Sequence, residues 1–164
     1  MGGLLSKFLT DKQAEKIGVW VEYTSVVNDD GTYPAFKIKR ISTSNVSYQA
    51  KINKPLREMD ALAKKDNYSA TEFLRINKVL AEIFVDEILV DWKNLKGSAS
   101  VDENGQVIVD SEGVPVCEEV PYSKEYAKEF LCNPDTAELL KWLMEQSSDI
   151  SNFLEANREK NLKS

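Results

Sequence analysis

The chain has 164 residues, of which 42% are hydrophobic and 29% charged, and its formal net charge is −6. This length is enough to bury the core of one domain, and no apolar run approaches the roughly eighteen residues that span a bilayer. Histidine is absent, which removes the usual general base, the commonest metal ligand and every histidine-dependent nucleophile. We therefore expect a single helix-rich domain over 1–164 that is cytosolic, with no membrane contact.

Charge is divided unevenly along the chain. Residues 1–65 carry eleven Lys/Arg against seven Asp/Glu (+4), and residues 66–164 carry ten against twenty (−10). The basic half is too weakly charged to indicate nucleic-acid binding, and the acidic half repels phosphate. Halves of opposite sign could steer one copy onto another or onto a basic partner, or could be ordinary solvated faces.

The first part of the chain predicts a β-hairpin. Residues 1–16 are a short, charged segment that forms a lead-in or a marginal helix. Over 17–41, alternating Val19, Val21 and Tyr23 are followed by the turn sequence at 28–31 and by a second run with Phe36 and Ile38. Pro34 lacks an N–H donor, so we expect it at a strand start or on an outer edge.

Residues 45–95 predict two helices. The polar cluster at 42–45 suits an N-cap for the first, which runs to about residue 65 with a kink or break near 53–54, before Pro55. Ser69 or Thr71 caps the second, which we expect to run over 71–95 and to end at Gly97. That core helix has the richest apolar stripe of the chain: Ile76, Leu80, Phe84, Ile88 and Trp92.

The remaining chain predicts a small hairpin insertion and then helices. Over 98–121 the sequence Val101-Asp-Glu-Asn-Gly recurs eight residues later as Val109-Asp-Ser-Glu-Gly, which indicates one or two tight turns. Helices follow over 123–154, with Ser123 as N-cap and a restart at Pro134. A charged tail occupies 155–164. The expected fold class is α+β, dominated by helices: an N-terminal β-hairpin, about four helices, and a β-hairpin insertion before the last of them.

Three groups of residues invite a chemical interpretation. The acidic loop 102–112 fails the EF-hand spacing, so turn formation explains its aspartates better than calcium binding. Two cysteines, Cys117 and Cys132, are too far apart in sequence for a CxxC zinc motif, which favours idle thiols. Four carboxylates on the core helix could form an acid/base or metal cluster or simply a solvated face: Glu82, Asp86, Glu87 and Asp91. We assign no catalytic, cofactor or metal residues, and the partner-binding surface stays unassigned.

An ordered series of short motifs runs from about residue 8 to residue 153. In order it comprises Phe8-x-Thr10-Asp11, Gly18-Val-Trp-Val21, Asn45-Val-Ser-Tyr48, Val90-Asp-Trp-Lys-Asn-Leu95, Val120-Pro-Tyr-Ser123, Ala127, Pro134 and Ser151-Asn-Phe153. In this order the chain resembles the tail assembly chaperones of long-tailed, siphovirus-like bacteriophages. The doubled Asp-x-x-Gly insertion departs from the single short turn that the resemblance leads us to expect.

The resemblance implies a protein without enzymatic activity or cofactors. Such a chaperone binds the tape measure protein and keeps it soluble until tail-tube subunits polymerise around it. The major tail tube protein and a second copy of the chain are further candidate partners, and the chaperone is expected in the host cytoplasm during infection but not in the mature virion. Alternatives are a structural virion protein of the neck or tail-completion type and, third, a small enzyme or metal protein.

Overall fold

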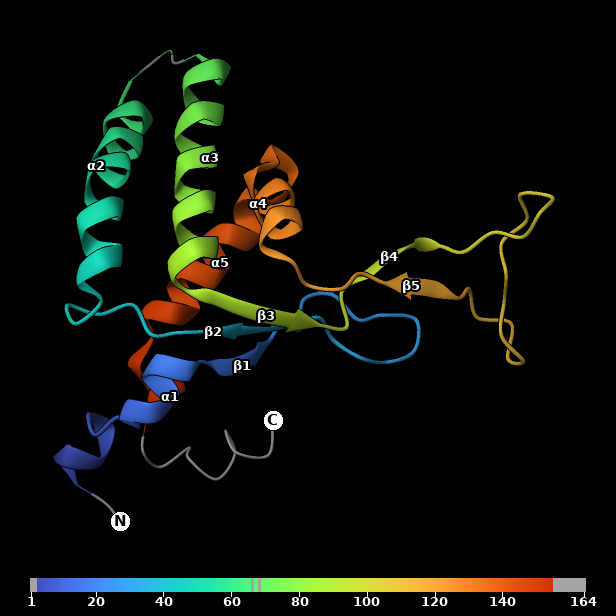
Figure 1. Cartoon of the computed structure of the whole chain (residues 1–164), viewed down its shortest axis with the longest axis horizontal. Helices are drawn as coiled ribbons and strands as arrows, with labels where there is room; N and C mark the ends of the chain where they lie inside the picture. The colour runs from blue at the N-terminus through green and yellow to red at the C-terminus, as the bar shows by residue number, and fades with distance from the viewer. Residues whose placement is uncertain (1–2, 66, 68, 155–164) are drawn as a thin grey trace.

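In the computed structural model, which describes residues 3–65, 67 and 69–154, five α-helices accompany a three-stranded antiparallel sheet, and the four longer helices lie on one side of it (Figure 1). This arrangement confirms the helix-dominated α+β class. The elements in order are η1 (Leu4–Lys7), α1 (Lys12–Ile17), β1 (Val19–Glu22), β2 (Ala35–Ile38), α2 (Val46–Ala63), α3 (Ala70–Glu87), β3 (Leu89–Lys93), β4 (Lys96–Ala99), β5 (Cys117–Glu119), α4 (Lys124–Cys132), η2 (Pro134–Thr136), α5 (Ala137–Ser148) and η3 (Ile150–Phe153).

The N-terminal β-hairpin is confirmed, with β1 antiparallel to β2 and Val21 opposite Phe36. Pro34 lies immediately before β2, and its carbonyl accepts a hydrogen bond from the Tyr23 N–H at 2.7 Å. Gly18 enters β1 with a φ of +100°, and a Cβ there would lie 3.1 Å from the Ile38 carbonyl oxygen. Glycine is therefore required at this position both for its backbone angle and for the close approach of β2.

The core helix is shorter than predicted. α3 ends at Glu87, and Leu89–Lys93 forms β3, the third strand of the sheet, with Trp92 opposite Phe36. Trp92 is buried as predicted, and Leu89 is buried as well, but burial alone did not distinguish a helix from a strand here. Residues 89–93 form a strand because β2 has a free edge, whose backbone groups gain ladder hydrogen bonds only if these residues are extended. Gly97 consequently lies in β4 and does not end a helix.

The sequence predicted a kink or a break near 53–54, and the break is absent, since α2 runs continuously over Val46–Ala63 with Pro55 inside it and buried. α2 packs along α3, and this contact holds the segment helical through the proline. At its start, the Asn45 side chain accepts a hydrogen bond from the Ser42 N–H at 2.7 Å and does not cap the helix. The Ser69 cap of α3 is confirmed, with Oγ 3.1 Å from the Thr71 nitrogen.

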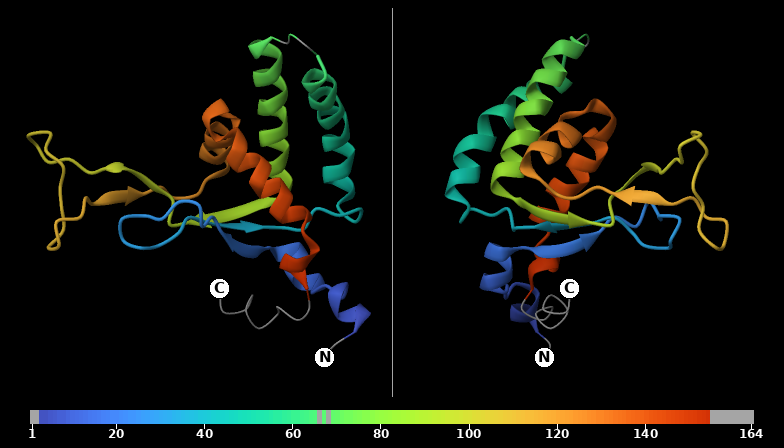
Figure 2. Two further views of the ribbon diagram at one scale, coloured as in Figure 1. Left: turned by 180° about the vertical axis from the view of Figure 1, so that it is seen from behind. Right: turned by 45° about the vertical axis from the view of Figure 1, so that its right-hand side comes forward.

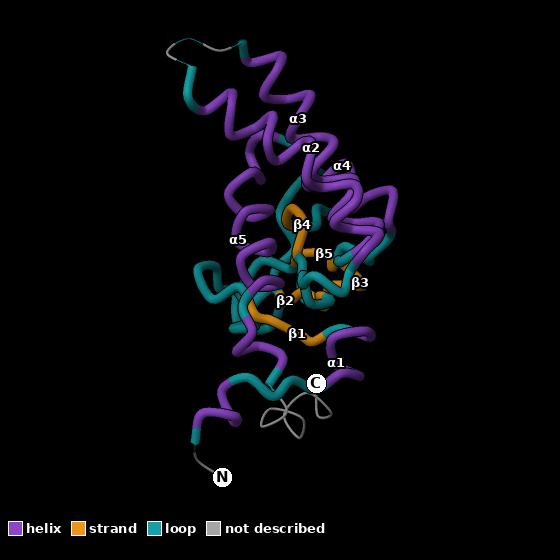
Figure 3. The backbone as a smooth tube through the Cα atoms, turned by 90° about the vertical axis from the view of Figure 1, so that its left-hand side faces the viewer, coloured by secondary structure: helices purple, strands orange, loops and turns teal. Residues whose placement is uncertain are grey.

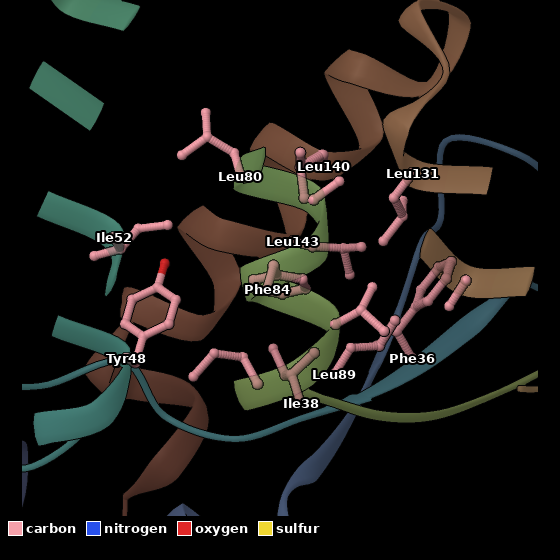
Figure 4. Packing of buried hydrophobic residues seen from close by; sticks show 14 of the residues in the cluster. Phe36, Ile38, Tyr48, Ile52, Leu80, Phe84, Leu89, Leu131, Leu140 and Leu143 are labelled. Carbon is pink, nitrogen blue, oxygen red and sulfur yellow. The ribbon is translucent and has the colours of Figure 1, made fainter. Parts of the chain in front are cut away.

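The hydrophobic core lies between one face of the sheet and the four helices (Figure 4). Phe36 and Ile38 of β2 and Phe84 of α3 belong to this core, and all three residues are at most 1% exposed. From other elements, Tyr48, Ile52, Leu80, Leu89, Leu131, Leu140 and Leu143 complete the part of the core shown there. The opposite face of the sheet is more open, and the Lys93 ammonium lies 4.3 Å from the Trp20 ring centroid on it.

The C-terminal helices begin as predicted, but the last one is divided. Ser123 caps α4 and Pro134 opens the η2 turn that precedes α5. α5 ends at Ser148, and the apolar residues beyond it form the 3₁₀ turn η3, whose Phe153 carbonyl accepts the Asp11 N–H at 2.8 Å. This contact fixes the N-terminal segment, which lies at the end of the molecule away from the α2–α3 connection (Figure 3). The predicted charged tail, 155–164, lies outside the described residues.

The predicted hairpin insertion is also confirmed, and it projects away from the rest of the fold (Figure 2). β4 and β5 form an antiparallel pair in which Lys96 lies opposite Glu119 and Ala99 opposite Cys117. We call residues 96–119 the arm. In both views of Figure 2 the helices leave the outer part of the arm uncovered, so its side chains form a surface separate from the core.

Candidate interaction site

The four carboxylates predicted on one helix do not form a cluster. Three lie on α3, and each of these faces a lysine: Glu82 lies 3.9 Å from Lys78, Asp86 2.8 Å from Lys128 of α4, and Glu87 2.6 Å from Lys51 of α2. The fourth, Asp91, lies on β3, where its carboxylate accepts the Trp92 N–H at 2.8 Å.

The Glu87 carboxylate joins α3 to α2. Hydrogen bonds from the Lys51 ammonium and the Ser47 hydroxyl lower the pKa of the Glu87 carboxyl below its usual value. The charged form is therefore favoured, and it links α3 to α2. Among the described residues no group of three or more His, Cys, Asp or Glu side chains is placed to hold a metal ion. The solvated, ion-paired interpretation of this helix face fits the geometry.

The two cysteines are free and lie on different elements, Cys117 at the start of β5 and Cys132 at the end of α4. Both are half-buried. The Cys132 thiol donates to the Glu129 carbonyl at 3.3 Å, a contact within one helical turn. In the part of the chain that the structure describes, neither thiol belongs to a group of three or more His, Cys, Asp or Glu side chains that could hold a metal ion.

The aspartates of the acidic loop hold two equivalent turns in the arm. Asp102 Oδ1 accepts the N–H groups of Asn104 and Gln106 at 2.9 and 3.0 Å. Asp110 Oδ1 accepts those of Glu112 and Val114 at 2.8 and 3.0 Å. The turns close with Gly105 and Gly113 at φ +77° and +81°, angles that favour glycine. The sequence repeat is thus a repeat of turn structure, as predicted.

The two turns bring three extended segments together at one point of the arm. Ser100 donates its N–H to the Val116 carbonyl at 2.7 Å, Val116 donates to Ile108 at 2.9 Å, and Ile108 donates to Ser100 at 2.9 Å. These residues are eight positions apart, the same interval as the repeat. The three backbone hydrogen bonds therefore form a closed cycle, in which each residue donates to one of the others and accepts from the third. This cycle holds the three segments of the outer arm together.

The arm exposes large apolar side chains. Val101, Val107 and Val109 are 57%, 51% and 52% exposed. Ile108 and Val116 are somewhat less exposed, at 41% and 40%. β-Branched side chains are typical of strands, where they usually pack against a neighbouring layer. No element in the described part of the chain covers these five side chains, and exposed apolar side chains gathered on one small element are a feature of interaction sites.

A groove of about 440 Å³ lies at the base of the arm, between it and the β1–β2 loop. Val27 lines it from the loop, and Val114, Pro115 and Val116 line it from the arm. Asp29, Asp30 and Asp110 also line it, so its walls are apolar and acidic, with the single cation Lys96 held 3.8 Å from Asp30. The groove therefore continues the exposed apolar surface onto the body of the protein.

The arm is fixed to the body through Trp92. The Trp92 indole N–H donates to the Val120 carbonyl at 2.8 Å, and its ring packs edge-to-face on Tyr122 with centroids 5.1 Å apart. Asn28 joins the loop to the same region through a 2.9 Å hydrogen bond to the Asn94 carbonyl. The root of the arm is thus held by the sheet, by the β1–β2 loop and by the segment leading into α4.

A second groove, of about 640 Å³, lies between α1 and the start of α2. Lys12, Lys16, Lys39 and Arg40 line it together with Glu15 and Glu87. Arg40 already lies 2.9 Å from Glu15, which neutralises much of the positive charge. This groove is at the other end of the molecule from the arm (Figure 1), and its lining carries four positive and two negative side chains.

The sequence located the two turns but not the interaction surface. The eight-residue repeat was the available signal, because two identical turns eight residues apart bring positions 100, 108 and 116 together. What it could not indicate was that no other element would cover Val101, Val107 and Val109, which depends on where the arm leaves the body.

Comparison with known proteins gives a family for most of the chain. A family model described as "YdaY prophage protein" matches residues 43–164, which run from just before α2 to the last residue and include the arm. No curated protein and no solved structure matches the chain. No helix in the described part of the chain is long and apolar enough to cross a membrane.

Proposed function

Because the chain belongs to the YdaY prophage protein family and is therefore phage-derived, we propose that it acts as a tail assembly chaperone. In this role it binds the tape measure protein of the same phage and keeps it soluble while the tail tube polymerises. It acts in the host cytoplasm and is left out of the mature virion. The major tail tube protein is a further candidate partner.

The observation that carries the proposal is the projecting arm with its uncovered apolar side chains. A chaperone of an apolar, helix-forming protein needs an accessible apolar surface, and the arm offers Val101, Val107 and Val109 without exposing the core. The order of motifs from Phe8 to Phe153 supports the same role by resemblance.

Co-expression with the tape measure protein of the same phage tests the proposal. We expect the tape measure protein to move from the insoluble to the soluble fraction and to copurify with the chain at a fixed ratio. A tape measure protein whose solubility and recovery are unchanged by the chain would contradict this function.

A structural virion protein of the neck or tail-completion type is the second candidate, because a projecting arm is also suited to linking neighbouring subunits. Mass spectrometry of purified particles separates the two functions. A chaperone is absent from the particle, whereas a virion protein is present at a fixed copy number.

A further inference from the structure

We propose that the arm and the groove at its base form one docking site for an apolar partner segment that carries lysine or arginine. The identification of that segment as part of the tape measure protein rests on the proposed function. The site itself is argued from the apolar surface, the charge and the rigidity of the arm.

The arm exposes many apolar side chains for a segment of its size. Five Val and Ile side chains of the arm are 40% to 57% exposed, and the groove extends this surface past Val114 and Pro115 to Val27. Uncovered β-structure with apolar side chains favours association with another chain. An apolar occupant would remove this surface from water and so gain free energy on binding.

The negative charge of the proposed site favours a partner segment with positive charge. The arm contains six acidic residues and one basic residue: Asp102, Glu103, Asp110, Glu112, Glu118 and Glu119 against Lys96. Asp29 and Asp30 add negative charge on the facing wall of the groove, and Lys96 already pairs with Asp30. A basic segment is therefore attracted, whereas two arms of this charge repel each other.

The arm is also preorganised for binding. Each Asp-x-x-Gly turn is held by two hydrogen bonds to an aspartate, and the ring through Ser100, Ile108 and Val116 ties the three segments together. A surface that is already ordered loses less conformational entropy when it binds. The apolar side chains are consequently presented at fixed positions on a scaffold that needs no core of its own.

Two arm variants and one control test the site. The apolar variant carries Val101→Thr, Val107→Thr and Val109→Thr, which keep the β-branched shape. The charge variant carries Glu103→Gln and Glu112→Gln, exposed residues whose side chains do not hold the turns. The control carries Val46→Thr and Glu129→Gln, an exposed apolar residue on α2 and an exposed acid on α4.

Binding is measured by fluorescence anisotropy with two labelled probes: overlapping fragments of the tape measure protein, and a synthetic amphipathic peptide of about 20 residues containing Leu and Lys. A matched peptide has Glu in place of Lys. We expect wild type and control to bind the Lys peptide and at least one basic fragment, with each arm variant weaker by about tenfold or more. The Glu peptide should not bind, and added salt should weaken binding to the Lys peptide.

The outcomes separate the docking site from the proposed function. Binding of the Lys peptide through the arm, without binding of any tape measure fragment, supports the site and contradicts the function. If wild type and both arm variants bind the fragments equally well, the proposed function stands, but the proposal that the arm is the docking site is overturned. Equal affinity for the Lys and Glu peptides overturns the charge preference. Self-association in analytical ultracentrifugation that the arm variants abolish would show a second copy as the occupant and overturn the proposal.

Discussion

At the scale of single residues, Trp92 connects more parts of the molecule than any other side chain discussed above. It is 4% exposed, packs against Phe36 of the central strand, and donates to the Val120 carbonyl beyond the arm. Its ring also meets Tyr126 and Phe130 of α4 edge-on. The sequence predicted that Trp92 would be buried but placed it on a helix, and the strand gives it a different set of neighbours.

Trp92→Ala should lower the free energy of unfolding by about 3 to 5 kcal/mol, because it leaves a large cavity and removes an indole hydrogen bond. Urea unfolding followed by far-UV circular dichroism measures the loss. Trp20→Phe is the matched control, because Trp20 is half-buried on the open face of the sheet, and it should cost about 1 kcal/mol or less. A Trp92→Ala protein as stable as wild type would contradict the placement of this ring in the core.

At the scale of elements, helix starts were predicted better than helix ends. Ser69 and Ser123 each accept a backbone N–H of the first turn at 3.1 Å, which is a local interaction that a sequence motif encodes. The end of α3 depends instead on the pairing of β3 with β2, and these strands are far apart in sequence. Of the kink or break expected near 53–54, the break was wrong for a similar reason, since α2 runs through Pro55 and packs along α3.

Ser69→Ala and Ser123→Ala should each lower the free energy of unfolding by about 1 kcal/mol, because each leaves a first-turn N–H without its side-chain acceptor. Thermal unfolding by circular dichroism measures both. Ser25→Ala, in the exposed β1–β2 loop, is the control and should change stability little. If all three variants unfold alike, the two serines do not act as caps.

At the scale of the whole molecule, the fold consists of a body with one core and an arm that adds little to it. Every residue in the core cluster lies outside residues 96–119. The outer part of the arm connects to the rest of the chain only through the β4–β5 pair at the base of the arm, and the Trp92 contact with Val120 lies outside the arm, so this outer part should be removable. This separation of stability from binding is what a site on a projecting element requires.

Replacing residues 100–116 with Asn-Gly should leave the body folded, because Ala99 and Cys117 are paired directly across β4 and β5 and a two-residue turn can join them. We expect the thermal midpoint to change by no more than about 3 °C, consistent with a loss of less than 1 kcal/mol. Differential scanning calorimetry measures it. A body that no longer unfolds cooperatively would show that the arm contributes to the core.

The sequence by itself determined the features that depend on neighbouring residues: the hairpin with its turn at 28–31, the caps of α3 and α4, and the two Asp-x-x-Gly turns. It also determined which residues are apolar enough to form the core, including Phe36, Phe84 and Trp92. The tertiary structure alone decided that residues 89–93 extend as β3, because their hydrogen-bond partners lie on β2. It also decided that the apolar side chains of the arm stay uncovered, because the arm leaves the sheet in a direction that no helix follows.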